Sequence, residues 1–467
     1  MRICDSLTAH PSGSSTHFGA LFRDNSSLHC NKKISMKIAI VGAGVIGVTT
    51  AYELAADGHE VTVFERHRAA AEEASFANAG VIAPAYQSFS SLPWVPPGMP
   101  AKVLKHLFSR HVPVKLKRPL SIAELGWLWR WYRAGKQGSY LANLASMQNL
   151  ASYSRERLRN ISTDLALEYE RSDGLTVLLR TAKDANLLLP SLEVLSENGV
   201  PYSKMTPEQT RQIEPALNPD RKFFGAVHLP TDEVGNCREF VLLLKKEAQQ
   251  MGVKFEFNST VASIEHAVSA TLFIANESSP RYFDGVVLCA GAASAGLLKS
   301  IKPLKLNIPL IPVYGYSVSA VVRENMNAPS SALIDERYKV AISRLGNRVR
   351  VAGSFEIGGP PIGNVSDSKR SSAYAILYKV LQDWFPGAAH TSNTSSVQEW
   401  RGARPTLPDG MPAIGASGIP GIWLNLGHGS SGWALSCGSA RAVADLIAQR
   451  PPEVDLSRMT IERFTAR

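Results

Sequence analysis

Apolar and polar residues change their spacing several times along this chain of 467 residues, and the changes predict where strands and helices lie. Lys37–Val41 is a short apolar run rich in β-branched residues, typical of a strand buried on both faces. Apolar positions then recur at helical spacing over Val45–Asp57, Gly58 ends that helix, and Glu60–Glu65 is a second strand. The pattern therefore predicts a β-α-β unit directly after Met36.

Further elements follow from the same two spacings. Helical spacing is found over Met147–Glu170, Ala185–Asn198, Thr206–Glu214, Asn236–Met251, Lys369–Trp384 and in a last helix that runs through Ala448. Strand patterns are found over Leu175–Leu179, Phe224–Leu229, Lys254–Asn258, Asp284–Ala290, Val313–Val322, Val340–Arg344, Arg348–Ala352 and Ile422–Leu426. Three of these strands, between residues 313 and 352, alternate like antiparallel strands and do not suit a doubly wound sheet. We therefore expect a second domain, built on an antiparallel sheet and interleaved with the first.

The turn between the first strand and helix carries candidate chemistry. Gly42, Gly44 and Gly47 form G-x-G-x-x-G, in which the first glycine allows a tight turn and the second lets backbone approach a pyrophosphate. The third glycine lets the helix pack on the strand, and the positive end of the helix dipole faces the phosphates. Glu65, 18 residues after Gly47, is placed to accept hydrogen bonds from ribose hydroxyls. A carboxylate there would repel the 2′-phosphate of NADP, despite the neighbouring Arg66.

Composition narrows the class of protein. The five cysteines are scattered and show no C-x-x-C spacing, which argues against a disulfide framework or a metal site and favours a cytoplasmic location. No apolar run reaches 18 residues, so we predict no membrane-spanning helix. Residues 1–35 have no apolar core of a secretory signal, and we expect them to be a disordered extension, with Met36 as an alternative true start.

The net charge of +10 is concentrated in one segment. Leu92–Arg133 holds eight Lys or Arg residues against Glu124 alone, interleaved with tryptophans and other aromatic residues, and Ala101–Arg110 has an apolar helical face. Such a segment can rest on the inner, anionic face of the cell membrane as a peripheral contact. It can equally be a helical part of the second domain that buries its aromatic rings. No nucleic-acid motif accompanies the charge.

Several motifs occur in the order of a known family. They are SFANAG (Ser75–Gly80), GYS (Gly315–Ser317), YKVAISR (Tyr338–Arg344), GARPTLPDGMPAIG (Gly402–Gly415) and LNLGHGSSGWALSCGS (Leu424–Ser439). With the first glycine turn, they resemble the FAD-dependent D-amino-acid oxidase/dehydrogenase superfamily, and within it the small subunits of bacterial D-amino-acid dehydrogenases. The resemblance runs from Met36 almost to the C-terminus.

The resemblance implies a fold and its division into domains. The fold is α/β: a Rossmann-type, glutathione-reductase-like FAD-binding domain with an interleaved α+β substrate domain built on an antiparallel sheet. We expect the FAD-binding domain to comprise residues 36–95, 225–305 and 395–467, and the substrate domain residues 96–224 and 306–394.

The resemblance also implies where FAD lies. The ADP half would rest on Gly42–Gly47 and Glu65, and the isoalloxazine ring would lie near Ala79, Gly80 and Gly427–Gly432. Small residues there let bare N–H groups reach the ring. The implied cofactor-binding residues are Gly42, Gly44, Val45, Ile46, Gly47, Glu65, Arg66, Ser75, Asn78, Ala79, Gly80, Val261, Ala290, Gly291, Gly427, His428, Gly429, Ser431 and Gly432.

The implied reaction is oxidative deamination of D-amino acids to 2-oxo acids and ammonia. Arg404 would hold the substrate carboxylate with two parallel hydrogen bonds and place Cα–H over flavin N5 for hydride transfer. The electrons would pass to a quinone or another acceptor. Tyr316 and Tyr338 are candidates for pocket walls or carboxylate hydrogen bonds. No general base is strictly required, because a deprotonated substrate fraction or loss of a proton to water suffices.

Each assignment has an alternative. Arg404 could pair with Asp409, the two tyrosines could be core residues, His428 could act through its backbone, and Cys437 could be an inert buried thiol. The family commonly has lysine before GYS, where this chain has Tyr314, which leaves the preferred side chain and primary against secondary amines open. Alternative functions are an oxygen-using oxidase, a dehydrogenase for glycine, sarcosine, D-proline, hydroxyproline or an opine, and a non-catalytic flavoprotein subunit.

Overall fold

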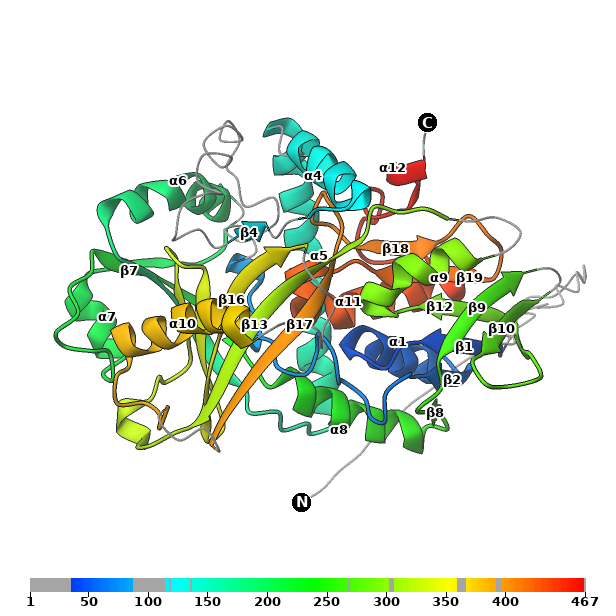
Figure 1. Ribbon diagram of the computed structural model, residues 1–467, viewed down its shortest axis with the longest axis horizontal. Coiled ribbons are helices and arrows are strands. Elements are labelled where there is room, and N and C mark those ends of the chain that lie inside the picture. The colour runs from blue at the N-terminus through cyan, green and yellow to red at the C-terminus, as the bar shows by residue number, and fades with distance from the viewer. Residues whose placement is uncertain are drawn as a thin grey trace, which may run out of the picture. The chain divides into compact units, whose positions relative to one another are not determined.

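A computed structural model describes residues 35–86, 114–116, 119–134, 137–197, 199–266, 269–301, 306–358, 367–391 and 396–465. The predicted extension up to residue 34 and the predicted helix Ala101–Arg110 lie outside these residues. The fold is the mixed α/β fold that the sequence predicts, with two large sheets (Figure 1).

The first sheet has six strands and contains the β-α-β unit. Its order is β18-β19-β12-β1-β2-β8, with parallel neighbours except for the antiparallel pair β18–β19. The strands are β1 (Lys37–Val41), β2 (Glu60–Phe64), β8 (Lys254–Glu256), β12 (Gly285–Leu288), β18 (Ala413–Ala416) and β19 (Ile422–Leu426). The strands and helix predicted from the first apolar runs are thus confirmed.

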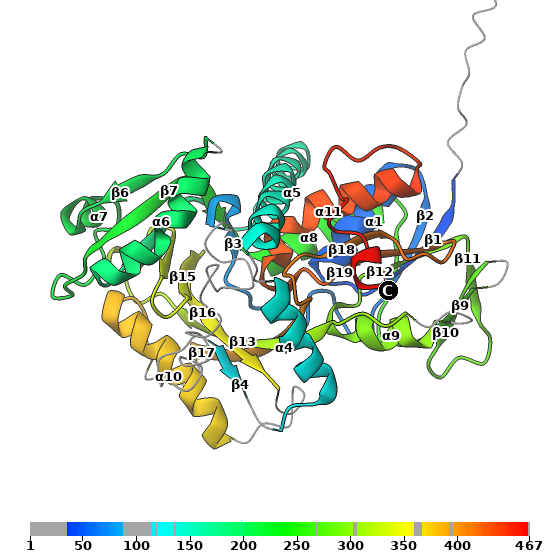
Figure 2. The same cartoon turned by 90° about the horizontal axis from the view of Figure 1, so that it is seen from above.

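Both faces of this sheet are covered, as the continuous apolar runs predict. Ile38 and Ile40 of β1 pack on one side and Ala39 and Val41 on the other, and all four are buried. The first side meets helices and the second a small antiparallel sheet with a short helix (Figure 2). These elements are α1 (Val45–Ala56), α5 (Gln137–Asp164), α8 (Cys237–Gln250) and α11 (Gly432–Ile447), then β9 (Val261–His266), β10 (Ala270–Ile274), β11 (Arg281–Phe283) and α9 (Ser294–Ser300).

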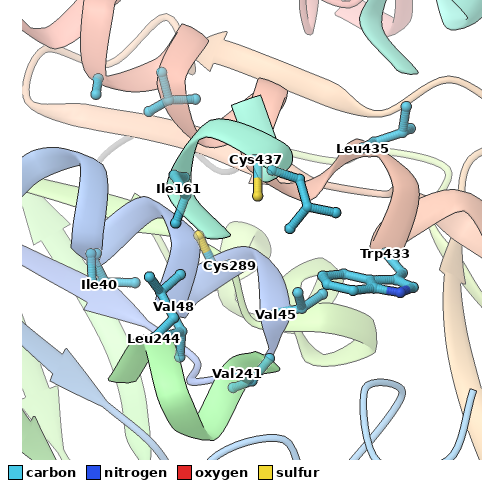
Figure 3. Close-up of a cluster of buried hydrophobic side chains, with 14 of the residues drawn as sticks. Ile40, Val45, Val48, Ile161, Val241, Leu244, Cys289, Trp433, Leu435 and Cys437 are labelled. Atoms are coloured by element: carbon cyan, nitrogen blue, oxygen red, sulfur yellow. The ribbon is translucent and has the colours of Figure 1, made fainter. Parts of the chain in front are cut away.

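The helical side is an apolar core with one buried charge cluster. Figure 3 shows Val45 and Val48 of α1 among side chains from α5, α8 and α11. Within this layer Glu53 of α1 is fully buried and accepts hydrogen bonds from Arg157 of α5 at 2.7 and 2.9 Å and from Arg441 of α11 at 2.9 Å. Because a buried carboxylate is stable only when it is paired, these contacts fix three helices against one another.

The second sheet is mainly antiparallel, in the order β17-β13-β16-β15-β14-β5-β7-β3, with β4 beside β16 and β6 beside β7. Its strands are β3 (Val81–Ile82), β4 (Val114–Leu116), β5 (Ser172–Leu179), β6 (Ser203–Met205), β7 (Gly225–Val234), β13 (Ile311–Val321), β14 (Ala332–Asp335), β15 (Val340–Leu345), β16 (Arg348–Ile357) and β17 (Val397–Thr406). The accompanying helices are α4 (Ile122–Ala134), α6 (Ala182–Glu197), α7 (Pro207–Ile213) and α10 (Asp367–Trp384), and α12 (Glu462–Thr465) ends the described chain. Figure 1 shows α10 lying across β13 and β16.

The predicted domain bounds and the sheets differ in three strands. β3, β7 and β17 are hydrogen-bonded in the second, mainly antiparallel sheet, although their ranges were assigned to the FAD-binding domain. Helix α5 packs on α11 beside the parallel sheet, although its range was assigned to the substrate domain. Strand and helix patterns report local periodicity but not the partner of an element, so such assignments need the tertiary structure. Among the described helices, none is long and apolar enough to cross a membrane.

Candidate functional site

A cavity of about 370 Å³ opens where the parallel strands end. Val41, Phe64, Cys289 and Leu426, at or just after the ends of β1, β2, β12 and β19, line it, and Arg404 of β17 lines it from the antiparallel sheet. Ligands of open α/β sheets bind at this edge. The predicted cofactor residues that line it are Gly42, Gly44, Val45, Ile46, Glu65, Arg66, Ser75, Asn78, Val261, Ala290, Gly291, Gly427, His428, Gly429 and Gly432.

The first glycine turn has the geometry of a dinucleotide cradle. Gly42 has a φ of +105°, and a Cβ there would lie 2.6 Å from the carbonyl oxygen of Cys289. A Cβ on Gly47 would overlap the carbonyl oxygen of Gly42, so only glycine allows α1 to pack this closely. Gly44 caps α1 without a side chain, while Ser75 Oγ accepts the Val45 N–H at 3.0 Å. Backbone at the start of α1 is thus open to an anionic group.

Glu65 closes this end of the cavity. Its carboxylate accepts the N–H groups of Ala43 at 2.7 Å and His67 at 2.9 Å, which hold it at the end of β2. Arg66 forms an ion pair with Glu73, so its charge is already compensated. The arrangement suits a ribose with free hydroxyls and gives Arg66 no free role toward a 2′-phosphate.

The second glycine turn lies at the other end of the cavity. Gly427 and Gly429 have φ values of +82° and +56°, and α11 begins at Gly432 with no side chain capping its first turn. Asn425 Oδ1 and Trp433 Nε1 are buried and have no hydrogen-bond partner within the described part of the chain. Both residues line the cavity. An uncapped helix start and unsatisfied buried polar atoms fit a polar cofactor such as FAD.

His428 in this turn is neutral. Its Nε2 lies 3.2 Å from Ser439 Oγ, and burial lowers the pKa of its imidazole to about 3. The backbone of His428 also bridges to Thr406, which joins the second glycine turn to the end of β17. The structure therefore supports a backbone role for His428 and not acid–base chemistry.

Arg404 is held in one position by three neighbours. Its guanidinium lies on the bare backbone of Gly315, where a Cβ would come within 2.5 Å of three guanidinium atoms. Nη1 donates to the carbonyl oxygen of Ser354 at 3.1 Å, and Cζ lies 4.5 Å from the centre of the Phe355 ring. Ser354, whose carbonyl accepts this hydrogen bond, has a φ of +60°, which is a strained conformation for a residue other than glycine. It lies at an irregularity in the pairing of β13 with β16.

The charge of Arg404 is uncompensated within the described residues. Asp409, the alternative partner, instead pairs with Arg463 at 2.6 Å. No carboxylate of the described chain forms an ion pair with Arg404. Burial lowers its pKa to about 10, so the group stays protonated at neutral pH. A partly buried, protonated guanidinium in a cavity wall is a site for an anion, and its planar donors match a carboxylate.

Tyr316 and Tyr338 do not line the cavity, which corrects the expectation that they form its walls. Tyr316 pairs with Arg401 in the strand register, and since side chains alternate along a strand, it lies on the face opposite Arg404. Its hydroxyl donates to Glu356 at 3.1 Å, and the ring of Tyr338 stacks against Arg180 at 4.9 Å. Tyr316 is a core residue of the antiparallel sheet, and Tyr338, in the turn between β14 and β15, is partly buried and packs against the same core.

The departure at Tyr314 is also on that opposite face. The guanidinium of Arg401 lies 3.6 Å from the centre of the Tyr314 ring and donates to Glu356 at 3.2 Å. Tyr314, the aromatic residue before GYS, therefore stacks against a second arginine, Arg401.

Four predicted cofactor residues, Gly47, Ala79, Gly80 and Ser431, are not among those that line the cavity. Gly47 packs under Gly42, and Ser431 precedes α11. Ala79 accepts the Ser343 hydroxyl at 2.7 Å, and the N–H of Gly80 donates to Asn78 Oδ1 at 3.0 Å, so this segment joins the cavity to the antiparallel sheet. The buried Cys437, in the apolar core of Figure 3, has a pKa raised by burial, as an inert thiol would.

Other residues lining the cavity were missed by sequence reasoning. Phe64 and Asn425 could have been found, because they stand at strand ends beside the glycine turns. The remaining residues lie partly in strands and helices and partly in the segments between them, and no sequence pattern marks them as lining a cavity. The missed residues are Val41, Phe64, His67, Glu72, Glu73, Ala74, Ser259, Thr260, Cys289, Ala293, Leu297, Ala403, Pro405, Asn425, Leu426, Ser430 and Trp433.

Comparison with known proteins gives two kinds of likeness. The family model of the FAD dependent oxidoreductases (DAO) matches residues 37–446. A D-amino acid dehydrogenase of Bradyrhizobium diazoefficiens is 39% identical over 434 residues, 92% of this chain and 100% of that protein. One of Allorhizobium ampelinum is 36% identical over 433 residues, 92% of this chain and 99% of that protein.

Solved structures share the fold. Glycine oxidase from Geobacillus kaustophilus matches with a TM-score of 0.66 and 22% identity, covering 91% of this chain and 98% of that one. L-proline dehydrogenase from P. horikoshii matches with a TM-score of 0.64 and 17% identity, covering 92% and 98%. At these identities the likeness concerns the arrangement of strands and helices.

Proposed function

Because the chain belongs to the DAO family of FAD-dependent oxidoreductases, we propose that it oxidises D-amino acids to 2-oxo acids and ammonia. The enzyme class follows from the family. The proposed substrate follows from relatives named D-amino acid dehydrogenase, which are 36–39% identical to this chain and are matched over nearly their whole length. One observation supports the substrate class: Arg404 is a partly buried guanidinium in the cavity wall without a carboxylate partner among the described residues.

Different parts of the cavity wall would bind different parts of FAD. The backbone of Gly42–Gly47 and the start of α1 would hold the diphosphate, and Glu65 the adenosine ribose. The N-terminus of α11 at the second glycine turn would stabilise negative charge on the ring. When bound, FAD supplies the acceptor for the hydride that leaves the substrate Cα.

Arg404 would orient the substrate. Gly315 gives its guanidinium room, and Ser354 and Phe355 hold it, so little ordering remains when a carboxylate binds. His428 is neutral and adds no competing charge. The carboxylates Glu65, Glu72 and Glu73 line the cavity around the first glycine turn, where the ADP half of FAD would lie. We therefore propose that the substrate amine loses its proton to water.

An anaerobic reduction experiment tests this function. The purified flavoprotein is mixed with D- and L-amino acids, and bleaching of the bound flavin is followed. We expect bleaching with D-amino acids. Arg404→Lys, which keeps the charge but loses the planar fork, should weaken apparent substrate binding by about tenfold or more with flavin retained. The matched control is Arg281→Lys on β11, where Arg281 pairs with Glu277.

The results separate the alternatives. Bleaching by no D-amino acid, or unchanged substrate binding in Arg404→Lys, would refute the proposal. Peroxide formation in air would indicate an oxidase, whereas turnover only with an artificial acceptor would support a dehydrogenase. Bleaching by glycine, sarcosine or D-proline in preference to other D-amino acids would change the substrate.

We further propose that the electron acceptor is a membrane quinone reached through α4. Trp127 on one side of α4 is buried, and its Nε1 donates to the carbonyl oxygen of Thr406, two residues from Arg404. The opposite side exposes an apolar stripe at helical spacing: Ile122, Leu125, Trp129 and Tyr132. Arg130 and Arg133 on the same helix would attract anionic lipid.

Vesicle sedimentation tests this contact. The holoenzyme should bind vesicles that contain anionic lipid and not purely zwitterionic ones. Trp129→Ser combined with Tyr132→Ser should reduce binding, whereas Leu189→Ser, which removes an exposed apolar side chain on α6, should not. Equal binding by all variants would argue against α4 as the contact.

A further inference from the structure

Three consecutive carbonyl groups of the segment Ser75–Gly80 accept hydrogen bonds from the antiparallel sheet. The donor and acceptor pairs are Arg350 Nη1 with Asn78 at 3.1 Å, Ser343 Oγ with Ala79 at 2.7 Å, and the Gly235 N–H with Gly80 at 2.8 Å. The donors belong to β16, to β15 and to the residue after β7. The segment is thus held to the sheet at each of its last three residues.

The same segment also reaches the first glycine turn. Ser75 Oγ accepts the Val45 N–H at the start of α1, and both Ser75 and Asn78 line the cavity. Between them, the ring of Phe76 is stacked on Trp400 of β17, with centroids 6.3 Å apart. The segment therefore joins the start of α1, where the diphosphate of FAD would bind, to the antiparallel sheet.

Arg350 is the charged donor among these contacts, and only 8% of it is exposed. Its Nε donates to Ser319 Oγ at 2.8 Å, and its Nη1 donates to the carbonyl of Asn78. Ser319 on β13 and Ser343 on β15 are its register partners, so three polar side chains form a row on one face of the sheet. Burial lowers the pKa of Arg350 to about 10, so the group is protonated at neutral pH and its hydrogen bonds are charge-assisted.

We propose that Arg350, which does not itself line the cavity, is a positioning residue that fixes the cavity wall at Asn78 for the binding of FAD. The proposal rests on the FAD site of the proposed function and not on the identity of the substrate. With Arg350 in place, the wall has its binding position before FAD arrives, and little ordering is left for the binding step. Without Arg350 the wall is free to take other positions, and the affinity for FAD falls with the fraction of molecules that do so.

Release of FAD from the purified holoenzyme tests this role. The holoenzyme is diluted, and the fluorescence of the released FAD gives its dissociation constant. Arg350→Met, which keeps an unbranched side chain but removes both donors, should raise that constant by about tenfold or more. Arg350→Lys, which keeps the charge and can serve one of the two acceptors, should raise it less. The visible circular dichroism of the flavin that stays bound should change in the same order, because it reports the surroundings of the ring.

The matched control is Arg348→Met on the same strand. Arg348 donates to the carbonyl oxygen of Ser319 at 2.9 Å and, within the described chain, forms no hydrogen bond with residues 78–80. Its substitution should leave the dissociation constant unchanged, while urea unfolding measures any loss of stability that both variants share. Ser343→Ala removes the neighbouring donor to Ala79 and should raise the constant by about threefold.

The outcomes separate this proposal from the proposed function. A parent protein that binds no FAD would refute the proposed function and this proposal with it. If the parent binds FAD, an unchanged dissociation constant and dichroism in Arg350→Met, or equal losses in Arg350→Met and Arg348→Met, would overturn the role of Arg350 alone. If Arg350→Met does not fold, unchanged affinity in both Arg350→Lys and Ser343→Ala would overturn it.

Discussion

Substitution of Gly315 by alanine should displace Arg404 without unfolding the protein. The new Cβ would lie within 2.5 Å of three guanidinium atoms, whereas ordinary contacts begin near 3.4 Å. The guanidinium must therefore move by about 1 Å or more. Because it is the flexible end of a long side chain, it can move at little cost to the fold.

The displacement should nevertheless be costly for substrate binding. Two parallel hydrogen bonds to a carboxylate require the planar fork to be correctly placed, and a shift of about 1 Å in a positioning group can reduce the rate about 100-fold. We expect kcat/KM for a D-amino acid to fall by about 10- to 100-fold. The free energy of unfolding should change by no more than about 1 kcal/mol, since alanine suits a strand at least as well as glycine.

Three measurements check this expectation: steady-state kinetics, carboxylate binding seen in the flavin spectrum, and urea unfolding. The matched control is Gly126→Ala in α4, where the nearest atom to a new Cβ is also an arginine nitrogen, at an ordinary 3.7 Å. Unchanged carboxylate binding in Gly315→Ala would refute the role of Gly315 as the seat of the guanidinium. A large loss of stability would show that the backbone, and not the side chain, had to give way.

Two further predictions concern the glycine turns. Gly47→Ala should abolish or strongly weaken FAD binding, because its Cβ would overlap the backbone oxygen of Gly42; titration of the apoprotein with FAD measures this, and normal affinity would contradict the close packing. For His428, the unfolded chain takes up a proton near pH 6.5 and the folded protein only near pH 3, so stability falls as the pH is lowered between these values, by about 1.4 kcal/mol per pH unit. His428→Asn should remove that contribution in urea unfolding between pH 4.5 and 7, and a slope identical to that of the parent protein would argue against a buried neutral imidazole.

The parallel-sheet half of the site could be predicted from sequence because its signals are local. The apolar run of β1, the spacing of Gly42, Gly44 and Gly47, and the acid at the end of β2 all lie within about 30 residues, as does the turn they form. The turn itself requires glycine at these points, because it needs a positive φ or a close backbone contact that a side chain would prevent. The second glycine turn and Arg404 depended on the resemblance to a family.

The substrate side of the site was decided by tertiary structure. Tyr316 and Arg404 both lie in motifs that the sequence singles out, yet strand register puts them on opposite faces of one sheet. Register is set by pairing between segments that are about 90 residues apart, and a shift of one residue would exchange the faces. The same pairing brings Gly315 under Arg404, and folding brings Phe76 onto Trp400.

What the sequence determined by itself was therefore a dinucleotide-binding turn and an α/β framework with an antiparallel part, to which the resemblance to a family added Arg404 as the candidate for binding a carboxylate. What only the tertiary structure decided was which of these groups meet. Period and turn chemistry are properties of short segments, whereas the face on which a side chain stands depends on a partner strand far away along the chain.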